Sequence, residues 1–330
     1  MTEAELEDLL SAPSRADIEF AGGIEGDILI LGAAGKMGPS LARRMRRALD
    51  AAGSRVRVTA VSRGGLEIEA VGHIRCDMLA PDALAELPDA PNVYYLAARK
   101  FGSTDAPEET WAANVLLPGL VAQRYRASRI VSFSTGNVYP LVPVESGGAS
   151  EDTPIGPVGE YAWSAAGRER MFEYAARAYG TRVTLLRLNY ACELRYGVLV
   201  DLAAKILRGE AIDLSMGYVN VIWQGDANSV CFRSLGHCAA PPFVLNLTGE
   251  ETLAVRDLAE RLAQRLGRPA VFQGEPAPTA LLNNAARCHK LFGPPAVGVA
   301  QMIDWVAEWM REGGRLLGKP TKFQVRDGRF

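Results

Sequence analysis

The stretch Ile28-Leu29-Ile30-Leu31-Gly32-Ala33-Ala34-Gly35-Lys36-Met37-Gly38 decides the fold of this chain. Its first four residues are apolar without polar alternation, a pattern typical of a parallel strand that is covered on both faces. A helix with one apolar stripe is expected over about 36–52. When a G-x-x-G-x-x-G turn joins such a strand to such a helix, backbone N–H groups and the helix N-terminus can hold a pyrophosphate. The stretch therefore predicts a dinucleotide-binding unit near the front of the chain.

Strands and helices alternate along the chain after this turn. Further strands are expected at 56–61, near Ile74, and at 93–98, 129–134 and 183–188, with helices over 107–126 and 161–178. This alternation predicts an α/β fold with a Rossmann-type doubly wound parallel sheet. Beyond residue 189 the expected elements are helices at 197–208, 252–266 and 298–313 and strand-like pieces at 219–224 and 243–247. We infer a smaller C-terminal α/β substrate domain.

These elements divide the chain into three parts. Residues 1–25 are expected to form an N-terminal helical extension. Residues 26–188 would form the Rossmann NAD(P)-binding domain, to which a segment near 219–247 returns. Residues 189–330 would form most of the substrate-binding domain and a C-terminal tail. The tail alternates cations with apolar residues over 317–330, a pattern that suits docking either on a neighbouring surface or on a second subunit.

The composition argues against several classes of partner. Lysines and arginines (36) nearly balance aspartates and glutamates (38), so we expect no nucleic-acid partner that relies on phosphate neutralisation. The sequence has neither an uncharged apolar run of about 18 residues nor a basic, apolar start, so we expect no membrane span and a cytoplasmic location. The five cysteines and three histidines share no ligand spacing, and no metal site is predicted.

The end of the second strand bears on the choice between NAD and NADP. An acidic residue there binds the ribose hydroxyls of NAD, whereas a cation can pair with the 2′-phosphate of NADP. Here the residues are Ser62 and Arg63, so NADP is the preferred cofactor and NAD the alternative. The alternative holds if Arg63 points to solvent or stacks on the adenine.

Several motifs occur in the order found in one enzyme superfamily. They are Asp77-Met78 after the third strand, Leu96-Ala97-Ala98 after the fourth, Asn114 in the next helix, Phe133-Ser134-Thr135-Gly136-Asn137-Val138-Tyr139, Tyr161, Asn189 and Asp226. Together with the glycine turn, they resemble the extended short-chain dehydrogenase/reductase superfamily, and within it the NAD(P)-dependent epimerase/dehydratase group. The likeness covers roughly residues 27–310.

The resemblance implies roles for these residues. The cofactor would contact Gly32, Gly35, Lys36, Met37, Gly38, Ser62, Arg63, Asp77, Met78, Leu96, Ala97, Ala98 and Tyr161. Thr135 would hydrogen-bond the reacting oxygen of the substrate, and Tyr161 would carry its proton. The implied substrate is a sugar, a nucleotide sugar or a sugar acid, and the implied assembly is a homodimer formed through the helices at 107–126 and 161–178.

One position departs from this family pattern. The family has a lysine four residues after the catalytic tyrosine, and here that position is Ala165. A tyrosine without that ammonium titrates near pH ~10, so only about one molecule in a thousand is phenolate at neutrality. Arg168 lies about 10 Å further along the helix axis, which places it too far to replace the lysine. Arg99 and Lys100 follow the fourth strand, and we expect Lys100 to replace the ammonium in part; the alternative is that both are surface charges.

The substrate side and the overall activity leave alternatives open. Asn189, Arg195 and Trp223 are the candidate substrate residues. The alternatives are a surface position for Arg195 and a core position for Trp223. Cys192 could line the same pocket. The leading prediction is an NAD(P)-dependent sugar epimerase, dehydratase or reductase. The alternative is a catalytically inactive NADP(H)-binding sensor or scaffold, which the alanine at position 165 favours.

Overall fold

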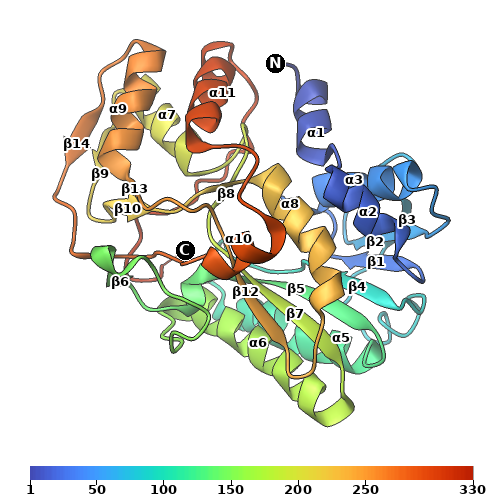
Figure 1. Cartoon of the computed structure of the whole chain (residues 1–330). Coiled ribbons are helices and arrows are strands. Elements are labelled where there is room, and N and C mark those ends of the chain that lie inside the picture. The colour runs from blue at the N-terminus through green and yellow to red at the C-terminus, as the bar shows by residue number, and fades with distance from the viewer. Residues whose placement is uncertain (330) are drawn as a thin grey trace.

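A computed structural model describes residues 1–329 of the chain, and its centre is one parallel β-sheet. Within these residues the sheet has seven strands in the order β12-β7-β5-β4-β1-β2-β3 (Figure 1). The strands are β1 (Ile28–Leu31), β2 (Val58–Ser62), β3 (Gly72–Arg75), β4 (Asn92–Tyr95), β5 (Arg129–Thr135), β7 (Arg182–Leu188) and β12 (Phe243–Leu247). Every neighbouring pair is parallel. The predicted doubly wound Rossmann-type fold is confirmed.

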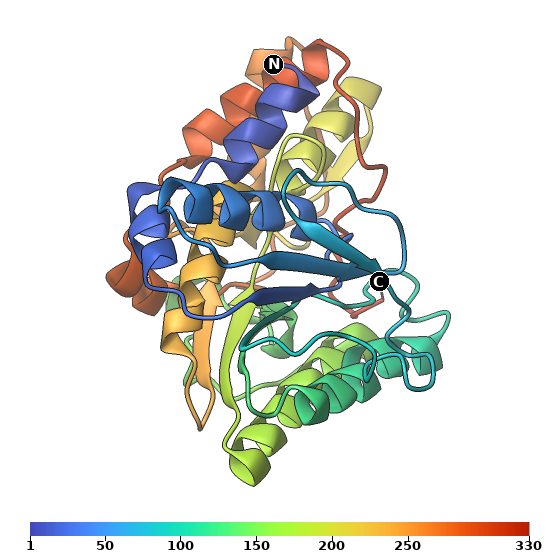
Figure 2. The same cartoon turned by 90° about the vertical axis from the view of Figure 1, so that its right-hand side faces the viewer.

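Helices cover both faces of the sheet, as the unbroken apolar strands require. Alternate residues of β1 point to opposite faces: Ile28 and Ile30 join one buried cluster, and Leu29 and Leu31 join another. The first face is covered by α3 (Gly38–Ala51) and α8 (Gln224–Arg233). The second is covered by α5 (Leu117–Arg124) and α6 (Gly159–Tyr179). Figure 2 shows α5 and α6 together below the strands.

The expected helix over 107–126 contains a π-helical turn. The structure has α4 (Pro107–Trp111), a π-helical segment at Ala112–Leu116, and then α5. Pro118 lies just after that segment and has no N–H to donate to the carbonyl of residue 114, which relaxes the normal hydrogen-bond pattern there.

The remaining elements build a smaller part above the sheet. Its helices α7 (Val198–Arg208), α9 (Val255–Leu266) and α11 (Val299–Arg311) share one buried apolar cluster (Figure 1). The short strands pair as β9 (Ala211–Asp213) with β14 (Val271–Gln273), β10 (Tyr218–Val219) with β13 (Leu253–Ala254), β8 (Ala191–Cys192) with β11 (Ile222–Trp223), and β6 (Val142–Pro143) with β15 (Thr279–Ala280). The helices α8 and α10 (Ala286–Phe292) are not among the sequence predictions.

The N-terminal extension forms two helices. The helix α1 (Glu3–Ser11) buries Leu6 and Leu10 in the cluster of the smaller part, and α2 (Arg15–Gly22) packs beside α3 and α8. Each begins with a capping box, which explains the break between them. Asp17 of α2 is fully buried and pairs with Arg44 of α3 at 2.6 Å, so the extension is fixed to the sheet layer.

The tail docks on its own chain. After α11 the chain runs down from the smaller part to the end marked C, between that part and the sheet layer (Figure 1). Of the two kinds of surface expected for it, the tail therefore uses a neighbouring one. Among residues 1–329, no helix is both long and apolar enough to cross a membrane.

Candidate active site

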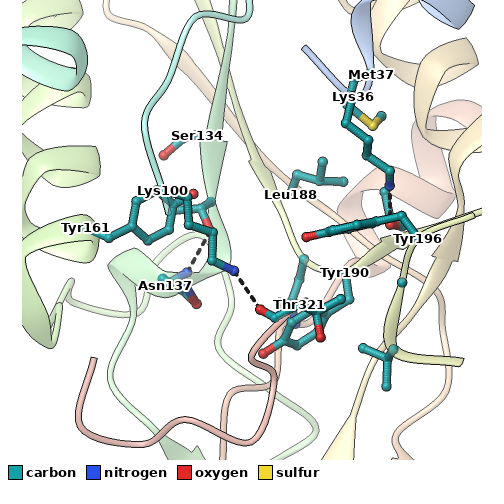
Figure 3. Close-up of a pocket in the computed structure, with 15 residues that line it drawn as sticks. Lys36, Met37, Lys100, Ser134, Asn137, Tyr161, Leu188, Tyr190, Tyr196 and Thr321 are labelled. Carbon is teal, nitrogen blue, oxygen red and sulfur yellow. Dashed lines mark hydrogen bonds between the residues drawn. The ribbon is translucent and has the colours of Figure 1, made fainter. Parts of the chain in front are cut away.

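A cavity of about 160 Å³ lies at the carboxyl edge of the sheet, where ligands bind in open α/β folds. It is bounded by the glycine turn, the end of β5, the first turn of α6, the loop after β7 and the tail (Figure 3). Its lining includes Lys36, Met37, Lys100, Ser134, Thr135, Asn137, Tyr161, Leu188, Asn189, Tyr190, Tyr196 and Thr321. Predicted cofactor, catalytic and substrate residues thus meet in one place.

The glycine turn fits a dinucleotide pyrophosphate. Gly32 has a φ of +84°, and a Cβ there would lie 2.5 Å from the backbone nitrogen of Ala97. A Cβ on Gly38 would lie 2.0 Å from the carbonyl oxygen of Ala33. Only glycine permits this close packing, which leaves the N-terminus of α3 open to an anion. Leu96, Ala97 and Ala98 follow β4 directly beside the turn, as predicted.

The residues expected at the adenosine end lie after β2 and β3. Ser62 donates a hydrogen bond to the carbonyl of Gly64, and its hydroxyl lies 2.9 Å from the Nε2 of His73. The Arg63 side chain is exposed. Asp77 is also exposed, whereas Met78 is buried against the sheet. This edge therefore carries the guanidinium of Arg63 and the polar side chains of Ser62 and Asp77.

Tyr161 and Thr135 form the centre of the candidate catalytic site. Thr135 ends β5 and Tyr161 lies in the first turn of α6, and the two side chains share a hydrogen bond. Burial raises the pKa of the Tyr161 hydroxyl, while the charge of Arg168 and the hydrogen bond with Thr135 act in the opposite direction. Deprotonation of Tyr161 therefore depends on the cations around it.

Ala165 and Arg168 follow Tyr161 on α6 and lie in different surroundings. Ala165 is fully buried in an apolar cluster with Val138 and Tyr139. Arg168 is buried too, and it donates to the carbonyl of Phe133 at 2.8 Å. Arg168 was expected to lie too far along the helix to replace the lysine; its guanidinium is bonded to Phe133 and Asn114, and its charge opposes the rise in the pKa of Tyr161.

Asn114 organises this corner of the site from the π-helical segment. Its carboxamide oxygen accepts from the backbone N–H of Arg99 at 2.8 Å and from Arg168 at 2.9 Å. Its nitrogen donates to the Arg99 carbonyl and to the hydroxyl of Ser164. The Asn114 side chain thus fixes both the loop that carries Lys100 and the buried guanidinium of Arg168.

Lys100 enters the cavity, whereas Arg99 does not line it. The Lys100 ammonium lies 5.6 Å from the centre of the Tyr161 ring and donates to the carbonyl of Thr321 at 3.1 Å (Figure 3). Burial lowers its pKa to about 8, and Asp201 opposes that shift. Arg99 instead forms an ion pair with Glu109.

Lys36 contributes a second ammonium group from the glycine turn. Its Nζ donates to the carbonyl of Ala191 at 2.6 Å and lies 4.6 Å from the centre of the Tyr196 ring (Figure 3). Burial lowers the pKa of Lys36 to about 8, against the opposing charge of Glu193. The motif predicted cofactor contact for this residue, but not a bridge from the turn to the loop after β7.

The candidate substrate residues separate in the structure. Asn189 lines the cavity. Arg195 is held by Glu7 at 2.7 Å and Glu193 at 2.9 Å outside the lining, because two carboxylates satisfy its guanidinium. Trp223 packs against Trp305 in the core of the smaller part. Arg195 and Trp223 were expected to contact the substrate, but the structure places both outside the cavity lining, in structural roles. Cys192 is buried beside that core.

A buried polar network supports the floor of the cavity. Ser134 donates to Glu169 at 2.5 Å, and Glu169 forms a two-pronged ion pair with Arg187 at 3.0 and 2.7 Å. Arg187 donates in turn to the hydroxyl of Tyr139, which donates to Asn246. The network ties β5, α6, β7 and β12 together beneath the catalytic residues. No group of three or more metal-ligating side chains occurs among residues 1–329.

Comparison with known proteins assigns the family. The model of the NAD dependent epimerase/dehydratase family matches residues 28–215. The chain belongs to this family. A search of curated proteins found no match.

Solved structures of similar fold cover most of this chain. The UDP-glucuronic acid 4-epimerase from Bacillus cereus in complex with NAD is 18% identical, with a TM-score of 0.74 over 87% of this chain and 97% of that one. The protein MoeE5 in complex with UDP-glucose and NAD is 21% identical, with a TM-score of 0.72 over 87% and 99%. The UDP-glucose 4-epimerase of Thermotoga maritima with UDP-glucose is 17% identical, with a TM-score of 0.71 over 87% and 99%. They support the family fold, and part of this chain has no counterpart in them.

Proposed function

We propose that this family member is an NAD(P)-dependent oxidoreductase of the epimerase/dehydratase type, acting on a carbinol carbon of a sugar, nucleotide sugar or sugar acid. The observation that carries the proposal is the hydrogen-bonded pair of Thr135 and Tyr161, in the same cavity as the glycine turn. The turn, the N-terminus of α3 and Leu96-Ala97-Ala98 would hold the dinucleotide. When bound, it would supply hydride transfer to or from the substrate carbon.

The chain's own residues would handle the proton. Thr135 and Tyr161 would hydrogen-bond the substrate oxygen, and Tyr161 would accept or return its proton. A tyrosine with a pKa near 10 gives up roughly 4 kcal/mol of driving force as a base at neutral pH. We assign the compensating charges to Arg168 and Lys100 in place of the lysine that position 165 lacks, because the charge of Arg168 favours the phenolate and the Lys100 ammonium lies over the Tyr161 ring.

For the cofactor we retain a preference for NADP. The similar structures named above include two with NAD, and their identity to this chain is low. The preference rests on the absence of a carboxylate at the end of β2 and on the Arg63 guanidinium, which can pair with a 2′-phosphate; because Arg63 is exposed, NAD stays the alternative. Fluorescence titration with NADPH and NADH would measure the preference. Arg63→Ala is expected to weaken NADPH binding at least about tenfold and leave NADH nearly unchanged; equal affinities for both in the unaltered protein would refute the preference.

The proposed assembly is a homodimer, and the proposed location is the cytoplasm. Helices α4 to α6 present exposed apolar side chains, among them Trp111, Leu116, Leu120 and Trp163. A groove of about 550 Å³ runs between α5 and Met171 of α6. An apolar face of this kind suits association with a second copy. The five cysteines, all within residues 1–329, are free thiols, which fits a reducing compartment.

Ala165 also supports a second candidate function, that of an NADP(H)-binding sensor without turnover. Both candidates can be tested on one preparation. The bound cofactor would be identified after purification, and its redox state followed by absorbance while sugars, nucleotide sugars and sugar acids are added. Reduction that disappears in Tyr161→Phe is expected for the enzyme. Tight cofactor binding without a redox change, and without isomerised or dehydrated product, across the panel would instead establish the sensor.

A further inference from the structure

A second cavity, of about 220 Å³, lies between the N-terminal extension and the helices α8 and α10. The start of α2 borders it on one side, α8 and α10 form its walls, and residues 293–296, which follow α10, complete its lining (Figure 1). Within residues 1–329, no residue lines both this cavity and the cavity that holds Tyr161. The second cavity is therefore a separate place in the fold.

Arg233 brings a guanidinium to this cavity from the end of α8. Its Nη2 donates to the hydroxyl of Ser229 at 3.3 Å, and its Nε lies 3.3 Å from a carboxylate oxygen of Asp17. The guanidinium also lies over the ring of Phe292, 5.0 Å from its centre. Among residues 1–329, no group accepts a hydrogen bond from its Nη1. The guanidinium is thus fixed in place with one terminal nitrogen left for a ligand.

Asp226 brings a carboxyl group to the same cavity from the first turn of α8. Its Oδ2 accepts from the backbone N–H of Val297 at 3.0 Å, and the N–H of Ala296 also bonds to the carboxyl group. A carboxylate has about four acceptor positions, so it can still accept from a ligand. Burial raises the pKa of Asp226, whereas the two N–H groups and the charge of Arg44 oppose that rise. An ammonium group in the cavity would favour the ionised carboxylate further.

The charges around the cavity nearly cancel. Asp17 is fully buried and pairs with Arg44 at 2.6 Å as well as with Arg233, so these three side chains carry one positive charge in excess. The carboxylate of Asp226 offsets that charge when it is ionised. A ligand that carries one negative and one positive group, with no net charge, therefore complements this wall.

The spacing of the two charged groups suits a short zwitterion. Arg233 and Asp226 are seven residues apart, which corresponds to ~10 Å along the helix axis. The contact with Ser229 shows that the side chain of Arg233 points back toward the start of α8, as long helical side chains do, and this shortens the gap. A small zwitterion can span what remains with one hydrogen bond of ~2.9 Å at each end.

The rest of the lining is largely apolar or already bonded within the chain. Its apolar part includes Ile222, Val230 and Phe292. His289 contributes a ring whose Nε2 lies 3.0 Å from the carbonyl of Thr248 and whose Nδ1 lies 3.5 Å from Glu250. At ~30 Å³ for each water, 220 Å³ corresponds to roughly seven waters, which is the scale of a small amino acid.

We propose that this cavity binds an apolar α-amino acid of the size of valine or leucine, with its carboxylate on Arg233 and its ammonium group on Asp226. The inference goes beyond the proposed function and does not depend on it, because it concerns a different cavity. It makes the N-terminal extension part of a ligand-binding unit, since Ser14 and Ala16 at the start of α2 complete the lining.

Calorimetric titration of the full chain would test the ligand class. The panel would contain valine, leucine, isoleucine and methionine, the matching carboxylic acids without the amino group, the matching amines without the carboxyl group, and inorganic phosphate. We expect at least one amino acid to bind at least about tenfold more tightly than both of its truncated analogues and than phosphate. Its affinity should be the same with and without saturating NADPH, because the two cavities share no lining residue.

Three variants would test the place of binding. Asp226→Asn keeps an acceptor for the backbone N–H groups but loses the charge, and it should weaken amino-acid binding at least about tenfold while leaving the truncated acid unchanged. Ala16→Trp, at an exposed residue of the lining, should fill the cavity and abolish binding without touching the charged groups. Ala4→Trp, at an exposed residue of α1 outside the lining, is the matched control and should bind normally. Circular dichroism would establish that each variant is folded.

Three results would overturn the inference. The first is that no amino acid of the panel binds, the second is that a truncated analogue binds as tightly as its amino acid, and the third is that folded Ala16→Trp binds normally. A failure of the proposed function would look different, because the absence of any redox chemistry would leave amino-acid binding in this cavity unchanged.

Discussion

Tyr161 and Ala165 lie one helical turn apart in very different surroundings. Tyr161 reaches the cavity, whereas Ala165 is fully enclosed by apolar side chains. The sequence could identify the missing lysine, because it depends only on spacing along one helix. It could not show that Arg168 acts on Tyr161, because that depends on how the helix sits against β5 and Asn114.

Restoring the family lysine in this setting is expected to destabilise the protein. Ala165→Lys adds a long cationic side chain to a site with no exposed surface, so it combines overpacking with burial of a charge. We expect the free energy of unfolding to fall by at least roughly 2 kcal/mol in urea denaturation. Ala178→Lys, on the exposed end of the same helix, is the control and should change it by less than about 0.5 kcal/mol. Equal stability of the two variants would show that the cluster around Ala165 can open.

The two buried lysines predict how the binding of anions in the cavity depends on pH. The pKa of Lys36 and that of Lys100 are both lowered to about 8, so their charges are lost as the pH rises through that value. Glu193, Cys192 and Arg195 act on the first, and Asp201 and Lys322 on the second.

We therefore expect the affinity for an anionic ligand of this cavity to be constant between about pH 6 and 7.5 and to fall above pH 8, by up to about tenfold per pH unit for each lysine that must be charged. Calorimetry over this range measures it. In Lys100→Arg the guanidinium keeps its charge, so the decline should become shallower. An affinity that rises between pH 8 and 10 would contradict the assignment.

Among the elements, the π-helical segment between α4 and α5 has the clearest role. It presents Asn114 where four hydrogen bonds join the loop after β4 to α6. The sequence predicted one continuous helix over 107–126, because the spacing of apolar residues does not reveal a local change of hydrogen-bond pattern. The glycine turn was predictable, since the strand, the turn and the helix are contiguous.

Asn114→Ala should remove this junction. It leaves the buried guanidinium of Arg168 and the Arg99 backbone short of partners, and we expect the free energy of unfolding to fall by roughly 2–4 kcal/mol. Gln123→Ala, at an exposed position of α5, is the control. Denaturant titration of both variants would measure the difference. A loss below about 0.5 kcal/mol for Asn114→Ala would mean that water replaces the amide.

At the scale of the whole molecule, the sequence predicted the layers and the return of a segment near 219–247 to them, but not the contacts by which that segment and the tail dock. In the structure, β12 lies beside β7 in the sheet and α8 covers the sheet beside α3. In the sequence, both elements come after the first residues of the smaller part. The last described residues, 319–329, form a strap that docks back on α6 from the far end of the chain. Such contacts depend on complementary surfaces far apart in sequence, and no local period encodes them.

The proposed dimer can be tested at this same scale. The double variant Leu116→Glu with Leu120→Glu places two charges on the apolar face of α5 and its π-helical segment, and it should convert a dimer to monomers. Leu116 is 55% exposed, so the fold should tolerate the change. Leu291→Glu, at a residue 45% exposed on α10, is the control. Sedimentation velocity would measure both, and a dimer that survives the double variant would exclude this face.

The close contact between Gly159 and Gly328 predicts how these two positions change together in evolution. Two backbones separated by most of the sequence meet where neither can carry a side chain, so each glycine is useful only while the other persists. In lineages that keep the strap, the pair should be inherited as a unit. In lineages that lose it, residue 159 should drift freely, within the limits of its φ of +83°, toward asparagine or aspartate. An alignment of related chains sorted by the presence of the strap would reveal this paired inheritance.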